Sequence, residues 1–297
     1  MVSPGILLVD KPAGLTSHDV VARTRRALGT RKVGHAGTLD PMATGLLVIG
    51  VEGATRLLTY IVGADKTYEA TIRLGQTTDT DDADGEILTH ASAESWDPVT
   101  PERVSAEIGA LTGAISQVPS SVSAIKVDGR RAYDRVRAGE EVVLAARDVT
   151  VSRFDVVAER SGAGFLDLDV VVDCSSGTYI RSLARDLGAG LGVGGHLTAL
   201  RRSRVGDFDV ADAVTVDDVV EEALLTPAAA AARVLDPLSV STEEARDLRH
   251  GKRLTGQADR LTGAQAAAID PNGVFVGVVE RRGADLKSAM NMPEAAG

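Results

Sequence analysis

A short segment of the chain, residues 33–45, contains one histidine, one aspartate and three glycines, and an apolar run follows it directly. Its glycines (34, 37 and 45) allow backbone turns with positive φ that other residues resist. Asp40 precedes Pro41, which is typical of a chain reversal or of a helix N-cap with proline in the first turn. A carboxylate with an ordinary pKa of about 3.9 is also ionised at pH 7 and can act as a nucleophile. The segment alone leaves Asp40 open between a structural cap and a reactive group.

Two further segments carry an aromatic and a cationic side chain that could belong to a site with Asp40. Residues 66–75 alternate, so Tyr68 shares one face of a predicted strand with the aliphatic residues that follow it. The same pattern describes an ordinary core aromatic at the end of a strand. Arg181 closes the segment 175–181, which leads from a glycine into a predicted helix, and it is equally interpretable as an ordinary arginine of the first helical turn.

The composition excludes several kinds of site. Cys174 is the single cysteine, so neither an intrachain disulfide nor a thiolate metal cluster can form. The five histidines are never spaced i, i+4, and the acidic run 79–86 lacks the register of a calcium loop, so we interpret it as an acidic turn. The glycine-rich stretch 188–195 has no nucleotide-binding spacing. We therefore expect no metal and no cofactor.

The charge is distributed unevenly along the chain. The net charge of −10 argues, taken alone, against a nucleic-acid partner. However, residues 75–110 carry −8 and residues 207–247 carry −9, so the remainder carries +7. Its arginines and lysines cluster within 23–32, 130–137 and 181–204. Such clusters are either solvated helix faces or a local positive surface that can contact phosphates.

Hydrophobic periodicity predicts the elements that must position these residues. The predicted strands cover residues 5–10, 46–51, 66–75, 148–157, 165–174, 196–205, 266–269 and 274–279. The predicted helices cover residues 16–28, 54–62, 101–111, 130–139 and 243–248, with another of about ten residues ending near Gly188. In 165–174, apolar residues alternate with aspartates, which is typical of an antiparallel strand with one wet face. The order predicts an α+β fold with a mixed, largely antiparallel central sheet and flanking helices.

The pattern changes after residue 235. Residues 207–235 predict a helix and a boundary, and the chain that follows predicts a small β-rich module. We therefore expect a large domain at 1–235 and a small C-terminal domain at 236–297. The apolar run 46–51 is far too short to span a bilayer, and the N-terminus does not have the pattern of a signal peptide. We expect a cytoplasmic protein.

Five segments, taken together, resemble the TruB pseudouridine synthases. They are LLVDKPAGLTSH (7–18), GHAGTLDPMATG (34–45), KTYEA (66–70), PSSVSAIK (119–126) and GTYIR (177–181). The resemblance covers about residues 5–205, with the motifs in the right order and spacing. It implies the pseudouridine-synthase fold in the catalytic domain 1–235 and, more loosely, a PUA-like RNA-binding domain at 236–297, whose acidity makes a strong phosphate contact by that domain doubtful.

The activity that the resemblance implies is conversion of uridine 55 in the T-arm loop of tRNA to pseudouridine. The glycosidic C–N bond breaks, the base turns within the site, and it rejoins the sugar through C5. The base must first be flipped out of the folded loop, at a cost of about a few kcal/mol. We expect tRNA as the partner, with no obligatory protein partner, no membrane and a monomeric enzyme.

The resemblance also assigns roles to individual residues. By similarity, Asp40 is the nucleophile, Arg181 pairs with it and holds its charge and orientation, and Tyr68 stacks on the base and is a candidate base for the C5 proton. Other positions similar to those that bind substrate are His35, which fills or supports the vacated stack, and Tyr179, Leu200, Lys11 and Lys126. The residues expected at the RNA backbone are Arg130, Arg131 and Arg202. The route, whether attack at C1′, addition to the base or abstraction of a C2′ proton, stays open.

Residues 119–145 resemble the flexible arm, or thumb, that closes on tRNA in this family. Two positions depart from the family pattern: Ala36 stands where many relatives carry threonine, and Val122 where they often carry an aromatic residue. A non-catalytic RNA-binding or tRNA-folding protein on the same scaffold is an alternative function. A guide-RNA-dependent enzyme of the dyskerin type is a third, which the lack of long basic tails disfavours.

Overall fold

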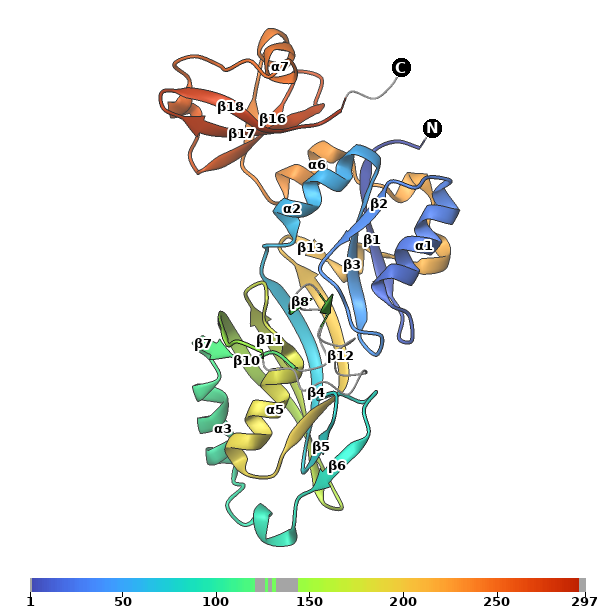
Figure 1. Ribbon diagram of the computed structural model, residues 1–297, viewed down its shortest axis with the longest axis vertical. Helices are drawn as coiled ribbons and strands as arrows, with labels where there is room; N and C mark the ends of the chain where they lie inside the picture. The colour runs from blue at the N-terminus through green and yellow to red at the C-terminus, as the bar shows by residue number, and fades with distance from the viewer. Residues whose placement is uncertain (1, 121–125, 128–129, 132–143, 294–297) are drawn as a thin grey trace. The chain divides into compact units, whose positions relative to one another are not determined.

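The computed structural model describes residues 2–120, 126–127, 130–131 and 144–293, and its chain forms two compact units (Figure 1). The terminal unit joins residues 1–64 to residues 204–297, and the central unit comprises residues 65–203. Helices and predominantly antiparallel sheets occur in both units, which confirms the predicted α+β class. Each unit is described by itself.

The first sheet of the terminal unit is built around β1 and β3. Its strands are β1 (Gly5–Lys11), β2 (Val33–Ala36), β3 (Thr44–Val51) and β14 (Val214–Thr215). β3 pairs antiparallel with β1 and with β2, while β14 is parallel to β1. Helix α1 (Ser17–Leu28) connects β1 to β2, and it begins as predicted, because Thr16 and Asp19 form a capping box. The predicted helix at 54–62 is a 3₁₀ turn, η1 (Glu52–Leu57), followed by one turn of helix, α2 (Leu58–Ile61).

The acidic stretch 207–235 differs from the helix that its composition predicts. It contains β13 (Phe208–Asp209), the 3₁₀ turns η3 (Val210–Asp212), η4 (Val216–Asp218) and η5 (Glu221–Ala223), and only the short helix α6 (Pro227–Ala232). The physical reason is pairing with β1. Ile6 and Leu225 exchange two backbone hydrogen bonds of 3.0 and 2.8 Å, and β14 continues along the same strand. Tertiary pairing thus overrides local helix propensity.

The C-terminal part of the terminal unit is a four-stranded sheet whose two faces belong to different hydrophobic clusters. Its strands, in spatial order, are β15 (Pro237–Ser239), β16 (Gln265–Ile269), β17 (Phe275–Arg282) and β18 (Asp285–Asn291). Ala267 and Val278 face a cluster that contains Ala230 and Ala231 of α6. The alternate residues, such as Ala268, pack with helix α7 (Thr242–Arg249) on the other face. The sequence predicts β16, β17 and α7 but misses β15 and β18.

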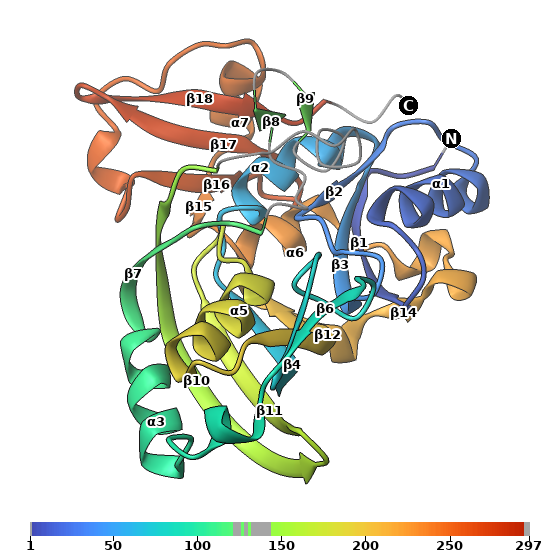
Figure 2. The same cartoon turned by 60° about the horizontal axis from the view of Figure 1, so that its bottom comes forward.

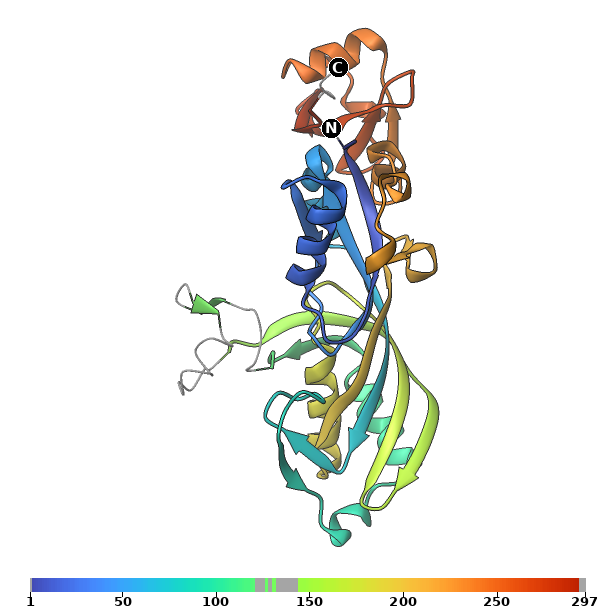
Figure 3. The same cartoon turned by 90° about the vertical axis from the view of Figure 1, so that its right-hand side faces the viewer.

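The central unit contains the second large run of strands, in the order β12–β4–β11–β10–β7. These are β4 (Lys66–Leu74), β7 (Gly113–Gln117), β10 (Arg147–Gly162), β11 (Phe165–Cys174) and β12 (Gly195–Val205, the last two residues belonging to the terminal unit). Helices α3 (Pro101–Ala110) and α5 (Ile180–Leu191) lie together on one face of this run (Figure 2). β10 and β11 form a long curved hairpin (Figure 3), and bulges interrupt their register. The remaining elements are β5 (Gln76–Thr78), β6 (Ile87–His90) and η2 (Ala93–Trp96).

The alternation predicted for 165–174 is confirmed, but its polar face is not simply wet. Each aspartate of β11 lies opposite a polar residue of β4, and the pairs are Asp167–Arg73, Asp169–Thr71 and Asp173–Thr67. Arg73 donates two hydrogen bonds of 2.7 Å to Asp167, whose exposed fraction is only 7%. These polar pairs therefore link β4 and β11 side chain to side chain, from Arg73–Asp167 at one end of the pairing to Thr67–Asp173 at the other.

Asp169 gives these polar pairs a specific acid sensitivity. Hydrogen bonds from Arg160 and Thr71 lower the pKa of Asp169 to about 2. Because the folded pKa lies below the unfolded value of about 3.9, the contribution of Asp169 to stability is complete above about pH 5 and is lost progressively as pH falls toward about 1. We expect Asp169→Asn to be less stable than the wild type by a constant amount above about pH 5, and the difference to shrink as pH falls, so that only a small part of it is left at pH 2. Urea unfolding followed by Trp96, the single tryptophan, measures the central unit, and Asp148→Asn, on an exposed site of β10, is the control. A difference unchanged at pH 2 would contradict this origin.

Helix α5 extends to Leu191, three residues beyond the end predicted at Gly188. Gly188 is needed for packing rather than for termination, because an added Cβ would lie 2.1 Å from the backbone carbon of Gly194. We expect Gly188→Ala to lower the free energy of unfolding of the central unit by about 1–3 kcal/mol. Urea unfolding followed by Trp96 fluorescence measures this change. The matched control is Gly109→Ala in α3, which meets nothing within 4 Å and should stabilise by about 0.5–1 kcal/mol. Equal effects at both positions would refute the packing argument.

The predicted helix at 130–139 is wrong for the two of its residues that are described. Arg130–Arg131 forms strand β9, which pairs antiparallel with β8 (Lys126–Val127). Residues 132–139 lie outside the described residues, as do Val122 and most of the predicted arm 119–145. The strand conformation of Arg130–Arg131 depends on pairing with β8, and the basic composition of this segment does not predict that pairing.

Candidate active site

Asp40 lies in the connection between β2 and β3, in a tight turn of the terminal unit. Ala43 donates its backbone N–H to the carbonyl of Asp40 over 3.1 Å, and residues 41–43 are irregular up to β3. The predicted chain reversal is confirmed, and the alternative of a helix N-cap is wrong. Gly37 (φ 84°) and Gly45 (φ 99°) bracket the turn with the positive φ that glycine permits. The path of the β2–β3 connection therefore depends on a glycine with positive φ on each side of Asp40.

The residues on either side of Asp40 are tied to Ser17, the first residue of α1, and to Gly14, which lies between β1 and α1. The hydroxyl of Ser17 accepts from Leu39 N–H at 2.9 Å and donates to the Leu39 carbonyl at 3.1 Å. On the other side, Gly14 donates its N–H to the carbonyl of Pro41 over 2.8 Å. Both contacts are made by neighbours of Asp40, so they fix the backbone that carries its side chain.

Lys11, at the end of β1, is completely buried beside the same turn. Its Nζ donates to the carbonyls of Leu15 (2.7 Å), Pro12 (3.0 Å) and Pro41 (3.3 Å). One ammonium group thus joins the segment 12–15 to the residue that follows Asp40. A buried charge of this kind needs several hydrogen-bond partners to offset its desolvation.

His35 lies on β2, one residue before Ala36, where the sequence departs from the family pattern. Its ring meets that of His18 edge to face, with centroids 5.6 Å apart and an interplanar angle of 82°. The sequence predicts that Gly34 can adopt a positive φ, but Gly34 is not among the glycines that do so. It lies instead close to Leu58, because an added Cβ would be 3.3 Å from Leu58 Cδ1. The terminal unit therefore brings Lys11, His35 and Asp40 into one neighbourhood around the β2–β3 connection.

Tyr68 and Leu200 occupy neighbouring strands of the central unit. Tyr68 lies on the buried face of β4, in the predicted register with Ala70, Ile72 and Leu74. Leu200 is a buried residue of β12, which runs beside β4. Two strand positions from Tyr68, the pKa of Lys66 falls to about 8, mainly because of burial and further because of Arg202. Arg202 itself has an exposed fraction of 1%, so its expected contact with an RNA backbone stays a prediction.

Tyr179 and Arg181 are positioned by the start of α5. Tyr179 is the residue before the helix, and the side chain of Gln117 pairs with both of its backbone groups. Tyr179 N–H donates to Gln117 Oε1 at 2.8 Å, and Gln117 Nε2 donates to the Tyr179 carbonyl at 3.0 Å. A buried glutamine at the end of β7 therefore sets where the helix begins and where its first residues point.

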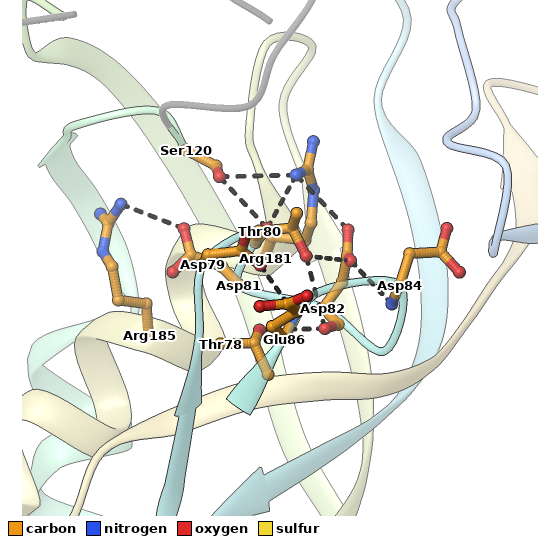
Figure 4. Close-up of polar contacts among 10 residues, drawn as sticks. All are labelled: Thr78, Asp79, Thr80, Asp81, Asp82, Asp84, Glu86, Ser120, Arg181 and Arg185. Atoms are coloured by element: carbon orange, nitrogen blue, oxygen red, sulfur yellow. Dashed lines mark hydrogen bonds and ion pairs between the residues drawn. The ribbon is translucent and has the colours of Figure 1, made fainter. Parts of the chain in front are cut away.

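The acidic turn 79–86 holds the guanidinium of Arg181 (Figure 4). Arg181 Nη1 donates to the carbonyl of Thr80 at 2.9 Å and lies 3.4 Å from both Asp82 Oδ2 and Ser120 Oγ. The side chains of Arg181 and Asp82 are only 6% and 5% exposed. Two buried, opposite charges in contact offset part of the cost of removing each other from water.

Asp82 is itself fixed by its own turn (Figure 4). Its Oδ1 accepts from Thr80 Oγ1 at 2.6 Å and from the backbone N–H of Asp84 at 3.1 Å, while the Thr78 hydroxyl donates to its carbonyl at 2.9 Å. The carboxylate that faces Arg181 is therefore rigid before any substrate arrives. These partners leave little freedom for the guanidinium that they hold.

Asp81, next to Asp82, makes a second cation contact (Figure 4). It adopts a left-handed backbone (φ 61°), and its Oδ2 lies 3.6 Å from Arg185 Nη1. Burial raises the pKa of the Asp81 carboxyl, an effect that a hydrogen bond from Ser120 and the charge of Arg185 partly offset. The turn thus pairs two consecutive aspartates with two arginines one helical turn apart on α5.

Sequence reasoning misses Asp82, Ser120 and Gln117 as parts of this site. The run 79–86 has the composition of an exposed acidic loop, and its contact with α5 joins residues about 100 positions apart. The sequence does contain one signal for this contact: an unusually acidic run, 79–86, and a predicted helix that carries Arg181 and Arg185 have opposite charges and could pair. Among the predicted site residues, Lys126, Arg130 and Arg131 are described only as the β8–β9 hairpin.

Two further searches cover the described residues. Within them, no group of three or more His, Cys, Asp or Glu side chains is arranged to hold a metal ion. In the same part of the chain, no helix combines the length and apolarity needed to cross a membrane.

Comparison with known proteins identifies the family. Residues 25–180, more than half of the chain, match the model of the TruB family pseudouridylate synthase N-terminal domain. The chain belongs to the TruB family. Residues 181–245 match the tRNA pseudouridylate synthase B C-terminal domain, and residues 235–293 match the tRNA pseudouridine synthase II C-terminal domain. This TruB enzyme is an RNA pseudouridine synthase, which confirms the predicted resemblance and enzyme class.

Relatives of this TruB chain match it over nearly its whole length. A protein of Leifsonia xyli named tRNA pseudouridine synthase B is 58% identical, covering 99% of this chain and 98% of its own. One of Rhodococcus jostii with the same name is 55% identical over 98% of this chain and 94% of its own. A chain in the crystal structure of the archaeal box H/ACA sRNP Nop10–Cbf5 complex has the same fold, with a TM-score of 0.70 at 24% identity over 97% of this chain and 86% of that one.

Proposed function

We propose that this TruB enzyme converts uridine 55 in the T-arm loop of tRNA to pseudouridine. The observation that carries the proposal is the 58% identity, over nearly the full length of both chains, to a relative named tRNA pseudouridine synthase B. In the reaction the C1′–N1 bond breaks, the uracil turns, and a C1′–C5 bond forms. N1 gains a proton and C5 loses one, so atoms and electrons balance without an added reagent.

In this proposal Asp40 is the nucleophile. A nucleophilic carboxylate must be ionised and must be held where the sugar or base arrives. The contacts of Ser17, Gly14 and Lys11 with the neighbours of Asp40 support such a role, because they restrict the turn without using its carboxylate. The Asp40 turn would then be a preformed part of the site rather than one assembled on binding.

Arg181 is proposed to act with Asp40, and Tyr68 to stack on the extracted uracil and take the C5 proton. The rigid support of Arg181 by Asp82 and Thr80 is consistent with a cation that must keep one orientation during the reaction. Burial of Tyr68 among aliphatic residues suits a ring that packs against a base rather than against water. His35, Tyr179, Leu200, Lys11 and Lys126 complete the proposed substrate site.

The proposal includes how the enzyme meets its RNA. The arm 119–145, with Arg130 and Arg131, would contact phosphates of the T-arm, and Arg202 would do so more weakly. The enzyme would act as a monomer on bare tRNA, without a protein or guide-RNA partner.

Mapping pseudouridine in a tRNA transcript incubated with the purified protein tests this proposal. We expect modification at position 55 alone, in full tRNA and in an isolated T-arm stem-loop, and none in a transcript in which cytidine replaces uridine 55. Modification at another position would refute the site assignment. Tight binding without any conversion would instead favour the non-catalytic RNA-binding function.

A further inference from the structure

Helix α5 begins with residues that are unusual at the start of a helix. Its N-cap is Tyr179, whereas N-caps are typically Ser, Thr, Asp or Asn, whose short side chains accept a backbone N–H. Its first turn contains no acidic residue, and Arg181 places a cation there, at the positive end of the helix dipole. The residues of α5 therefore do little by themselves to fix where the helix begins, and contacts from other elements must do so.

Gln117, the last residue of β7, supplies such a contact from outside the helix. Its side-chain amide bonds both the N–H and the carbonyl of Tyr179, at 2.8 and 3.0 Å. One amide can reach both groups only if they point to the same side, as they do in an extended strand. In an α-helix the two groups of one residue point in opposite directions along the axis. The amide thus holds Tyr179 in the extended conformation that it adopts, with φ −105° and ψ 109°.

Gln117 is itself held firmly enough to act as a support. Its exposed fraction is only 2%, and it pairs in register with Arg147 of β10. The next residue, Val118, accepts a hydrogen bond of 2.7 Å at its carbonyl from Arg185 Nη2. The amide therefore projects from a backbone that is tied to the sheet on one side and to the second turn of α5 on the other.

The contact acts on Tyr179 more directly than on Arg181. The direction of a side chain follows its Cα–Cβ bond, which changes when a residue moves from an extended to a helical conformation. Loss of the Gln117 amide would thus redirect the ring of Tyr179. Arg181 has separate support, because Thr80 and Asp82 hold its guanidinium at the other end of the side chain.

We propose that Gln117 is a positioning residue for the reaction, which keeps Tyr179 extended at the start of α5 and so directs its ring toward the uracil. This inference rests on the proposed function, from which the uracil and the place of Tyr179 in the substrate site are taken. Gln117 acts through Tyr179 and not by contact with the RNA. Its loss should therefore slow the chemical step in the bound complex and leave tRNA affinity nearly unchanged.

The experiment measures single-turnover tritium release from tRNA labelled at C5 of uridine, with saturating enzyme, and tRNA affinity by fluorescence anisotropy. Gln117→Met keeps the length of the side chain and removes both hydrogen bonds. We expect the rate constant to fall about 10–100-fold, because a displacement of about 1 Å can have an effect of this size, and Kd to stay within about threefold. The matched control is Gln76→Met, which removes one exposed contact of 3.5 Å with His90 and should change neither quantity.

A second substitution covers the possibility that Gln117→Met does not fold. Gln117→Glu keeps an acceptor for the N–H of Tyr179, loses the donor to its carbonyl, and places a carboxylate at the positive end of α5, which favours folding. We expect a smaller fall in rate, about 3–10-fold, since one of the two bonds remains. Urea unfolding followed by Trp96 fluorescence gives the folded fraction of each variant, so that a loss of stability is separated from a loss of rate.

A double-mutant cycle with Tyr179→Leu tests whether Gln117 acts through the ring. We expect Tyr179→Leu to be slow, and Q117M/Y179L to be slower than Tyr179→Leu by no more than about twofold. Additive effects, or an unchanged rate in Tyr179→Leu, would overturn the proposal. Wild-type rates in the folded Gln117 variants, or a loss of affinity as large as the loss of rate, would overturn it as well. Failure of the proposed function is separate, since the wild type itself would then form no pseudouridine.

Discussion

Asp40→Asn is expected to reduce pseudouridine formation by at least about 10⁴-fold while leaving tRNA affinity within about threefold of the wild type. Asparagine has nearly the same shape as aspartate and fits the same turn, so the substitution removes the charge and the nucleophile but not the backbone contacts of Leu39 and Pro41. Loss of a covalent catalyst typically has an effect of this size. Tritium release from tRNA labelled at C5 of uridine measures the chemical step under single-turnover conditions.

The control for this experiment is Asp217→Asn, which removes a carboxylate whose side chain is 89% exposed. It should retain wild-type tritium release. Release that survives in Asp40→Asn would rule out Asp40 as the nucleophile. A loss of tRNA affinity equal to the loss of activity would show that the carboxylate serves binding instead.

Arg181→Gln is expected to destabilise the central unit by about 3–5 kcal/mol, because it leaves Asp82 charged and buried without its cation. Asp82→Asn should cost a similar amount for the converse reason. The double variant R181Q/D82N removes both charges and leaves neither of them buried without its partner, so we expect it to be less destabilised than either single variant. Urea unfolding followed by Trp96 fluorescence reports on this unit directly, since Trp96 lies within it.

The double variant also separates structure from chemistry. If Arg181 acts in the reaction, R181Q/D82N should recover stability but stay at least about 100-fold less active than the wild type in tritium release. Recovery of both would show that Arg181 serves folding alone. Arg281→Gln removes one member of an exposed ion pair with Asp259 and should change neither property by more than about 1 kcal/mol or twofold.

Much of the local structure follows from the sequence because it depends on near neighbours. Strand β11 alternates between buried and partly exposed residues from Leu168 to Cys174, and helix α1 begins at Ser17, after the capping box that Thr16 and Asp19 form. The turn at Asp40 follows from Pro41 and the flanking glycines. In each case the residues that decide the conformation lie within a few positions of one another.

The parts that the sequence does not reveal depend on contacts between distant positions. Asp82 and Asp167 are charged residues in polar stretches, yet both are buried, because Arg181 and Arg73 reach them from elements about 100 positions away. Gly188 resembles a helix terminator, but it is required by the backbone of Gly194. Recognition of the family came from motifs, and motifs identify residues without identifying the partners that hold them.

The division of the chain constrains the order in which the protein can be made. The central unit is one continuous segment, whereas the terminal unit needs residues from both ends of the chain. On the ribosome, residues 65–203 emerge as a complete unit while β1 and β3 still lack β14 and the Leu225 contact. Because domains fold as they are completed, the terminal unit must wait for synthesis to pass residue 225 and, for its second sheet, residue 291. The carboxylate of Asp40 is therefore synthesised before the central unit, and the unit that holds it is finished after the central unit.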